Sequence, residues 1–174
     1  MNRESLRRRL HMLGLLSEAV NAMRSLSAHH FRTARAELPA ARNYHQGVEA
    51  AVAAVGLAKP PPSSIPPAML LVASDLGLCG SYNSTLVQRG LDLYRERHIG
   101  RAYGIGKRGV NALQHAGHAV ATSYAVPTST AGLTPLLLRL AEDLLKDYLS
   151  GAFGSLLVVS ARFEGVGTCR PVVT

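Results

Sequence analysis

Apolar or small side chains recur through the first 55 residues at a spacing that brings them onto one side of a helix. They occupy positions 6, 10, 13, 16, 20, 23, 26, 31, 34, 38, 41, 44, 48, 52 and 55. The mean step of about 3.5 residues is that of a left-handed coiled-coil seam, which packs against a second helix. Residues 1–58 are therefore predicted to form one long helix of coiled-coil type that needs a helical partner.

Proline divides the chain in two places. Pro39 lies inside the helical pattern, where it removes one backbone N–H and crowds the preceding turn, so a kink is predicted near that residue. Residues 59–67 are rich in proline and cannot be helical, which predicts a semi-rigid linker. The expected organisation is a helix over 1–58, a linker over 59–67 and a domain over 68–174.

Strand-like and helix-like patterns alternate beyond the linker. Strands are expected at 68–74, 101–105, 118–124 and 155–161, and helices at 83–97, 107–116 and 135–149. This alternation predicts an α/β domain with a mostly parallel Rossmann-like sheet and helices on both faces. The tail over 165–174 is expected to add a hairpin partner.

The helix expected at 135–149 has a clear beginning and a charged side. Thr134 is predicted to cap it and Pro135 to occupy its first position. Its acidic residues are interspersed with basic ones, which is typical of a solvated face. The acidic residues are Glu142, Asp143 and Asp147, and the basic ones are Arg139 and Lys146.

Composition limits the classes of function. The net charge of +8 comes mainly from arginine and suits nucleic acid, anionic headgroups or an acidic protein partner. Aromatic residues are few and do not alternate with the basic ones, so no base-stacking surface is expected. No apolar run approaches the roughly 18 residues that cross a bilayer, so direct membrane insertion is not expected. Cys79 and Cys169 are far apart and predict a reducing compartment.

Two glycine-rich turns and two histidine pairs are possible nucleotide-binding or metal-binding sites. Gly104–Gly109 fits Gly-x-Gly-x-x-Gly, but 123–128 lacks the acidic residue that a dinucleotide site has about 20 residues further on. A structural turn is favoured, and an α/β nucleotide-binding module using Gly104–Gly109 is the alternative. No Lys-Ser/Thr pair follows Gly77 and Gly80, so they form no P-loop. The histidines at 29, 30, 115 and 118 lack zinc-site spacing, so no metal is expected.

The run from Met69 to Asn83 carries a more specific signal. An apolar strand stops at Ser74 and Asp75, and the glycines at 77 and 80 force a turn. This sequence motif resembles the Ser-Asp-Arg-Gly-Leu-Cys-Gly-x-Tyr/Phe-Asn signature of the gamma subunit of rotary F-type ATP synthases, with Leu76 in place of the usual Arg. Asp75 is expected to form the turn, and Cys79 to be a small buried hydrophobic residue.

The resemblance extends over nearly the whole chain. Residues 10–34, with the Ala-Met pair at 22 and 23, look like the family's first helix. The turn at 106–109 is similar to the family's Gly-Lys-Lys-Gly, and 140–163 to the helix and strand that close its middle domain. Two further features depart from the pattern. The family has a Lys-rich segment before the Ala-Met pair, whereas this chain has Ser17–Val20 there. The family also has a second long helix that winds around the first, and residues 1–174 do not include a segment that resembles it.

The resemblance implies a non-catalytic central-stalk subunit, the rotor of a proton- or sodium-translocating ATP synthase, with no catalytic, cofactor or metal site of its own. Its implied partners are the alpha and beta subunits of the catalytic hexamer, the epsilon subunit and the membrane c-ring, with no nucleic acid. The implied location is peripheral, at the cytoplasmic face of the bacterial inner membrane. The residues expected at partner interfaces are Arg9, Leu13, Leu16, Val20, Met23, Arg24, Asp75, Leu78, Cys79 and Tyr82.

Overall fold

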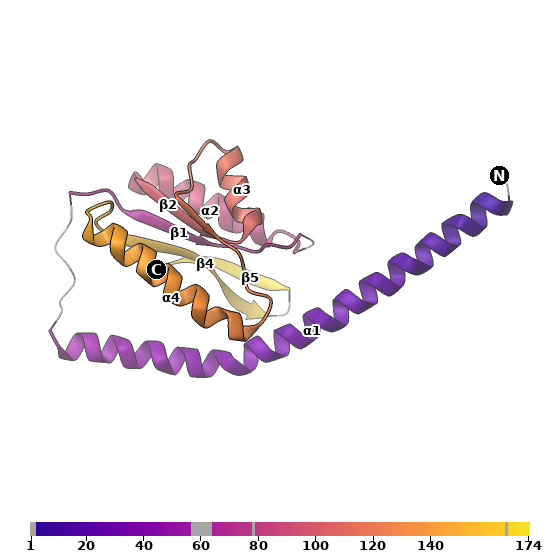
Figure 1. Cartoon of the computed structure of the whole chain (residues 1–174), viewed down its shortest axis with the longest axis horizontal. Coiled ribbons are helices and arrows are strands. Elements are labelled where there is room, and N and C mark those ends of the chain that lie inside the picture. The colour runs from indigo at the N-terminus through magenta and orange to yellow at the C-terminus, as the bar shows by residue number, and fades with distance from the viewer. Residues whose placement is uncertain (1–2, 57–63, 78, 166) are drawn as a thin grey trace. The chain divides into compact units, whose positions relative to one another are not determined.

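The computed structural model describes residues 3–56, 64–77, 79–165 and 167–174 (Figure 1). The chain divides into two compact units, over 1–60 and 61–174. Residues 59–63 of the expected linker lie outside the described residues, so its conformation stays a prediction. Each unit is described by itself below.

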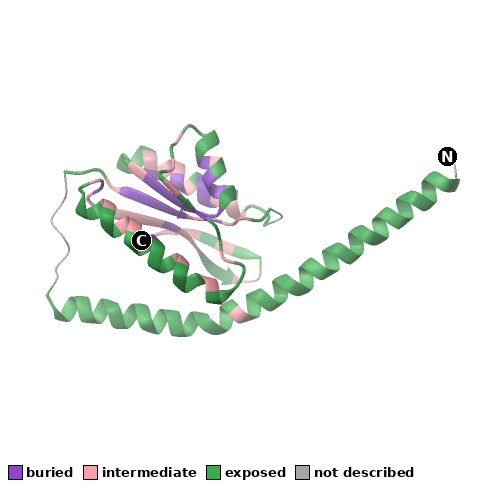
Figure 2. Ribbon diagram, viewed as in Figure 1, coloured by how far each residue is buried: buried purple, intermediate pink, exposed green. Residues whose placement is uncertain are grey.

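The first unit is the helix α1, Arg3–Ala54, which confirms the long helix expected from the 3.5-residue spacing. The helix continues through Pro39, and Figure 1 shows that its axis changes direction in its middle part. A kink at Pro39 itself stays a prediction, because the Thr33 hydroxyl also donates to the carbonyl of His29 at 3.2 Å, a bond that bends helices. None of the described residues of α1 is buried (Figure 2).

The second unit contains one five-stranded sheet in the order β3-β2-β1-β4-β5. The parallel strands are β1 (Ala68–Val72), β2 (Arg101–Ile105), β3 (Thr122–Tyr124) and β4 (Leu156–Gly165). Strand β5 (Thr168–Val173) pairs antiparallel with β4, as expected of the tail. The mostly parallel sheet predicted from the sequence is therefore confirmed.

Helices cover both faces of this sheet, also as predicted (Figure 1). Helices α2 (Tyr82–Arg97) and α3 (Lys107–His115) lie on one face, and α4 (Leu133–Leu149) lies on the other. The predicted cap at Thr134 and the predicted first helical position at Pro135 are both wrong, because α4 begins at Leu133. A 3-10 turn, η1 (Thr130–Gly132), runs directly into α4, so that Gly132 holds the cap position and Thr134 is already helical.

Strand β3 is shorter than the predicted 118–124. Gly117 adopts a φ of +86°, a left-handed conformation that turns the chain after α3. His118 then stacks its ring on that of Tyr94 at 3.8 Å between centroids. The chain reaches β2 when the Ala121 N–H donates to the carbonyl of Ala102 at 2.7 Å, and the strand ladder begins at Thr122.

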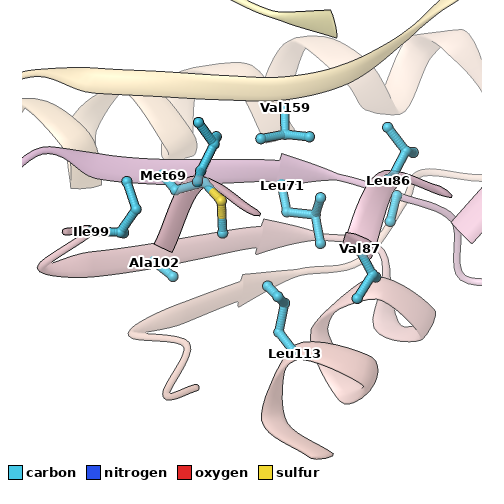
Figure 3. Packing of buried hydrophobic residues seen from close by; sticks show 10 residues of the cluster. Met69, Leu71, Leu86, Val87, Ile99, Ala102, Leu113 and Val159 are labelled. Atoms are coloured by element: carbon cyan, nitrogen blue, oxygen red, sulfur yellow. The ribbon is translucent and has the colours of Figure 1, made fainter. Parts of the chain in front are cut away.

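Alternate residues of β1 build two separate cores. Met69 and Leu71 face α2 and α3, where they pack with residues such as Leu113 and Val159 (Figure 3). Leu70 faces the opposite way, into the core beneath α4. Burying a side chain of this size contributes about 1.5–3 kcal/mol, so a strand buried on both faces anchors both helical layers.

Two tyrosines hold α4 on the sheet and correct the solvated face that the sequence predicted. Tyr103 donates its hydroxyl to Asp147, which also pairs with Arg101 at 2.9 Å, and Tyr124 donates to Asp143 at 2.7 Å. Burial, aided by these carboxylates, raises the pKa of both phenols, to about 12 for Tyr103. Asp143 and Asp147 therefore face the sheet, because each can meet a buried hydroxyl there.

Candidate functional site

The first candidate surface is a stripe on α1, which we call the α1 seam: Leu13, Leu16, Val20 and Met23, flanked by Arg9 and Arg24. All six predicted interface residues of this helix are exposed, and the four apolar ones keep 58–62% of their surface accessible. Their spacing of three and four residues places them along one side of the helix. Such a stripe is typical of a helix that packs against another structure.

The second candidate surface is the loop between β1 and α2, residues 73–81, at the carboxyl edge of the sheet. Asn83 ties this loop to α2, because its side-chain oxygen accepts the Ser74 N–H at 3.0 Å and its amide donates to the Ser74 hydroxyl at 2.9 Å. The Ser74 hydroxyl in turn donates to the carbonyl of Leu76 at 2.8 Å. The serine and asparagine of the signature therefore fix where the loop begins and ends.

Cys79 is exposed, which corrects the buried position expected from its apolar neighbours. Gly80, with a φ of +54°, turns the chain after it, and the thiol folds back to donate to the carbonyl of Gly77 at 3.3 Å. Tyr82 is partly buried, and burial, followed by the nearby Cys169 and Cys79, raises the pKa of its hydroxyl. Leu78 lies outside the described residues.

Asp75 was expected to form its own turn, but its carboxylate bonds to two other loops instead. One carboxylate oxygen accepts the backbone N–H of Lys107 at 2.6 Å, and the other accepts that of Val126 at 2.8 Å. These partners follow β2 and β3, so a single side chain joins the three loops at the carboxyl edge of the sheet. Whether Asp75 also lies in a partner interface stays a prediction.

The glycines of Gly104–Gly109 serve close packing. A Cβ on Gly104 would lie 2.3 Å from a methyl of Val110, and one on Gly109 would lie 2.4 Å from the Cβ of Ala73. Gly106, at a φ of +93°, passes so close to β1 that a Cβ would lie 2.5 Å from the Ala73 carbonyl. In addition, Asp75 already binds the helix N-terminus where dinucleotide phosphates bind in Rossmann folds. This geometry favours the structural turn over the nucleotide-binding alternative.

A shallow hollow of about 470 Å³ lies beside the 73–81 loop, and it is open to solvent. Arg108 forms one wall, with its guanidinium against Gly77, where a Cβ would lie 3.2 Å from Nη2. Sequence reasoning did not single out Arg108 or Asn83 as functional, although both lie within segments that resemble the family. Within the described ranges, no cluster of His, Cys, Asp and Glu could hold a metal ion, and no helix is long and apolar enough to cross a membrane.

A family model described as ATP synthase matches residues 2–174. The chain belongs to this family. The gamma-subunit resemblance of its sequence is thereby supported, and similar curated proteins carry the name ATP synthase gamma chain.

Two of these family members illustrate the extent of the match. The gamma chain of Synechococcus sp. (strain JA-3-3Ab) is 29% identical over 113 residues, which cover 60% of this chain and 34% of that protein. The gamma chain of Pelotomaculum thermopropionicum is 24% identical over 184 residues, covering 97% of this chain and 62% of that protein. The chain thus spans between one third and two thirds of these relatives' length.

A solved structure of the family shares the fold. It is the central stalk and c-ring of the mitochondrial ATP synthase of Tetrahymena thermophila, with a TM-score of 0.68 and 19% identity. The similarity covers 88% of this chain and 70% of that chain. A long helix joined to a mostly parallel α/β unit is therefore an architecture that this family contains.

Proposed function

We propose that this chain acts as a gamma-type rotor subunit in the central stalk of an F-type ATP synthase. The observation that carries the proposal is the α1 seam, an exposed apolar stripe on a long helix, in a chain that matches the family over residues 2–174. A rotating shaft needs a long and stiff helix, and it needs no catalytic site. The seam supplies the surface by which such a shaft packs against its second helix and the surrounding ring.

In this proposal catalysis belongs to the beta subunits, and the chain carries torque between ion flow and ATP synthesis or hydrolysis. Helix α1 contacts the alpha and beta subunits, and the α/β unit lies beside the epsilon subunit and the membrane c-ring. The complex stands at the cytoplasmic face of a bacterial inner membrane, with this chain as a peripheral component. The ion that drives it is a proton or a sodium ion.

Arg9 and Arg24 would define how α1 meets its ring. Both are exposed and flank the apolar residues of the α1 seam. Complementary carboxylates on the ring would fix the register of the shaft and steer assembly more than they add affinity. On the α/β unit, the predicted contacts at Asp75, Cys79 and Tyr82 belong to the loop and helix start that the Ser74–Asn83 bonds hold in place.

Assembly with catalytic subunits tests the proposal. Residues 1–174 are joined to the part of the P. thermopropionicum gamma chain that follows its matching region, and the chimera is expressed with the alpha and beta subunits of that organism. We expect a stable complex of the three polypeptides by size-exclusion chromatography. The natural gamma chain is the positive control, and a chimera without residues 1–58 is the matched negative one.

Two results would count against the proposal. One is a chimera that stays free while the natural gamma chain assembles. The other is equal assembly with and without residues 1–58, because α1 would then contribute nothing to the contact.

A further inference from the structure

Helix α3 begins without a cap of its own. Its cap position is Gly106, which has no side chain, and its first turn contains no acidic residue. Instead, Lys107 and Arg108 place two cations there. Cations are unfavourable beside the free N–H groups and positive dipole end of a helix. A negative group from elsewhere in the chain would therefore stabilise the start of α3.

Asp75 supplies that group from the loop after β1. Its oxygens lie 2.6 Å from the Lys107 nitrogen and 2.8 Å from the Val126 nitrogen, which are residues 32 and 51 positions away. Hydrogen bonds to an ionised acceptor are among the stronger ones in proteins. Each oxygen takes one of the two amides, so the carboxylate bridges them as a bound oxyanion would.

The surrounding backbone keeps the three loops in register with this bridge. The Gly106 N–H donates to the carbonyl of Tyr124 at 2.9 Å, and the Arg108 N–H donates to the carbonyl of Ser74 at 3.1 Å. The turn between β2 and α3 is thus bonded to both neighbouring loops. The carboxylate completes this arrangement at the point where the helix dipole is directed.

We propose that Asp75 is a positioning residue that acts as an internal anion, taking at the Gly104–Gly109 turn the place that a ligand phosphate holds in related turns. By filling that place it fixes the 73–81 loop against α3 and the loop after β3. Fixing the loop also fixes the position of the exposed Cys79 relative to Arg108 in the lining of the hollow. This inference does not depend on the proposed function, since it concerns the chain alone.

Amide hydrogen exchange on the full chain tests the inference. Asp75→Ala is compared with the unmodified chain and with Asp92→Ala, a matched control that removes a carboxylate paired with Arg95 on α2. We expect the amides of Lys107 and Val126 to exchange about ten- to a hundredfold faster in Asp75→Ala only, the range expected when a hydrogen bond to a charged group is lost. The amide of Leu70, in the central strand, serves as the reference.

Added anion separates an internal anion from an ordinary structural bond. Sodium formate should enter the vacated place and slow exchange at Lys107 and Val126 in Asp75→Ala, whereas sodium chloride at equal ionic strength should not. Unchanged exchange in Asp75→Ala, or faster exchange that formate does not slow, would overturn the inference.

A second variant keeps the test decisive where Asp75→Ala does not fold. Asp75→Asn retains one acceptor oxygen, so it should protect one of the two amides and expose the other. Protection of both amides in Asp75→Asn would show that the charge is not needed and would overturn the inference as well.

Discussion

Gly104→Ala should destabilise the α/β unit because its added methyl has no space. The new Cβ would lie 2.3 Å from Cγ2 of Val110, whereas carbon atoms in contact are ordinarily about 3.5–4.0 Å apart. The backbone cannot move aside easily, since Gly104 pairs with Leu71 on one side and Ser123 on the other. Overpacking of this kind costs about 1–3 kcal/mol.

The assay is urea denaturation of the full chain, followed by tyrosine fluorescence, with Val110→Ala as the partner in a double-mutant cycle. Val110→Ala alone removes two buried methyl groups and should cost about 1.5–3 kcal/mol. The double variant removes the clash, so its loss should be smaller than the sum of the two by about 1–2 kcal/mol. The control is Gly165→Ala, where a Cβ meets nothing within 4 Å. Additive losses, or a neutral Gly104→Ala, would refute the packing role of this turn.

Three further predictions concern α4, the α1 seam and the free chain. Burial raises the pKa of Tyr103 from 10.0 to about 12. The stability that its neutral hydroxyl contributes is therefore complete below pH 10 and is lost between pH 10 and 12. Tyr103→Phe should lose less stability than the unmodified chain between pH 9 and pH 11, as measured by denaturation at both pH values. Met23→Lys should lower the number of protons pumped per ATP hydrolysed in vesicles that contain the chimera. Asn21→Lys lies about 160° away around the helix and should leave this number unchanged. Neither variant should change the free energy of unfolding by more than about 0.5 kcal/mol. The free chain should self-associate through its exposed seam, and sedimentation should show more monomer in Leu13→Lys, whereas a strict monomer with α1 intact would exclude such pairing.

Elements with a strong periodicity of apolar residues, or with clear helix- and strand-breaking residues at their ends, could be predicted from the sequence. The spacing of apolar residues in 6–55 gave α1, and the alternation after residue 68 gave the sheet with helices on both faces. Both follow from local physics, since 3.5-residue and strand-length patterns depend only on neighbouring residues. The strand expected at 155–161 is likewise present as β4, which lies between β1 and β5.

Some errors concern contacts between residues distant in the chain, and others concern local turns such as those at Gly80, Gly117 and Gly132. Asp143 and Asp147 looked solvated because their own helix carries cations, but the deciding partners, Tyr124 and Tyr103, come from other strands. Cys79 looked buried because its neighbours are apolar, whereas the turn at Gly80 keeps it at the surface. The bridge made by Asp75 spans 32 and 51 residues, so no local pattern could reveal it.

Rotation driven by ATP hydrolysis tests the central claim most directly. The chimera that carries residues 1–174 is assembled with alpha and beta subunits fixed to a surface, and a bead on the α/β unit reports its angle. We expect the bead to rotate in one direction only, and we expect that rotation to be lost when α1 is deleted. A complex that hydrolyses ATP while the bead shows only random motion would contradict the assignment of this chain as a rotor.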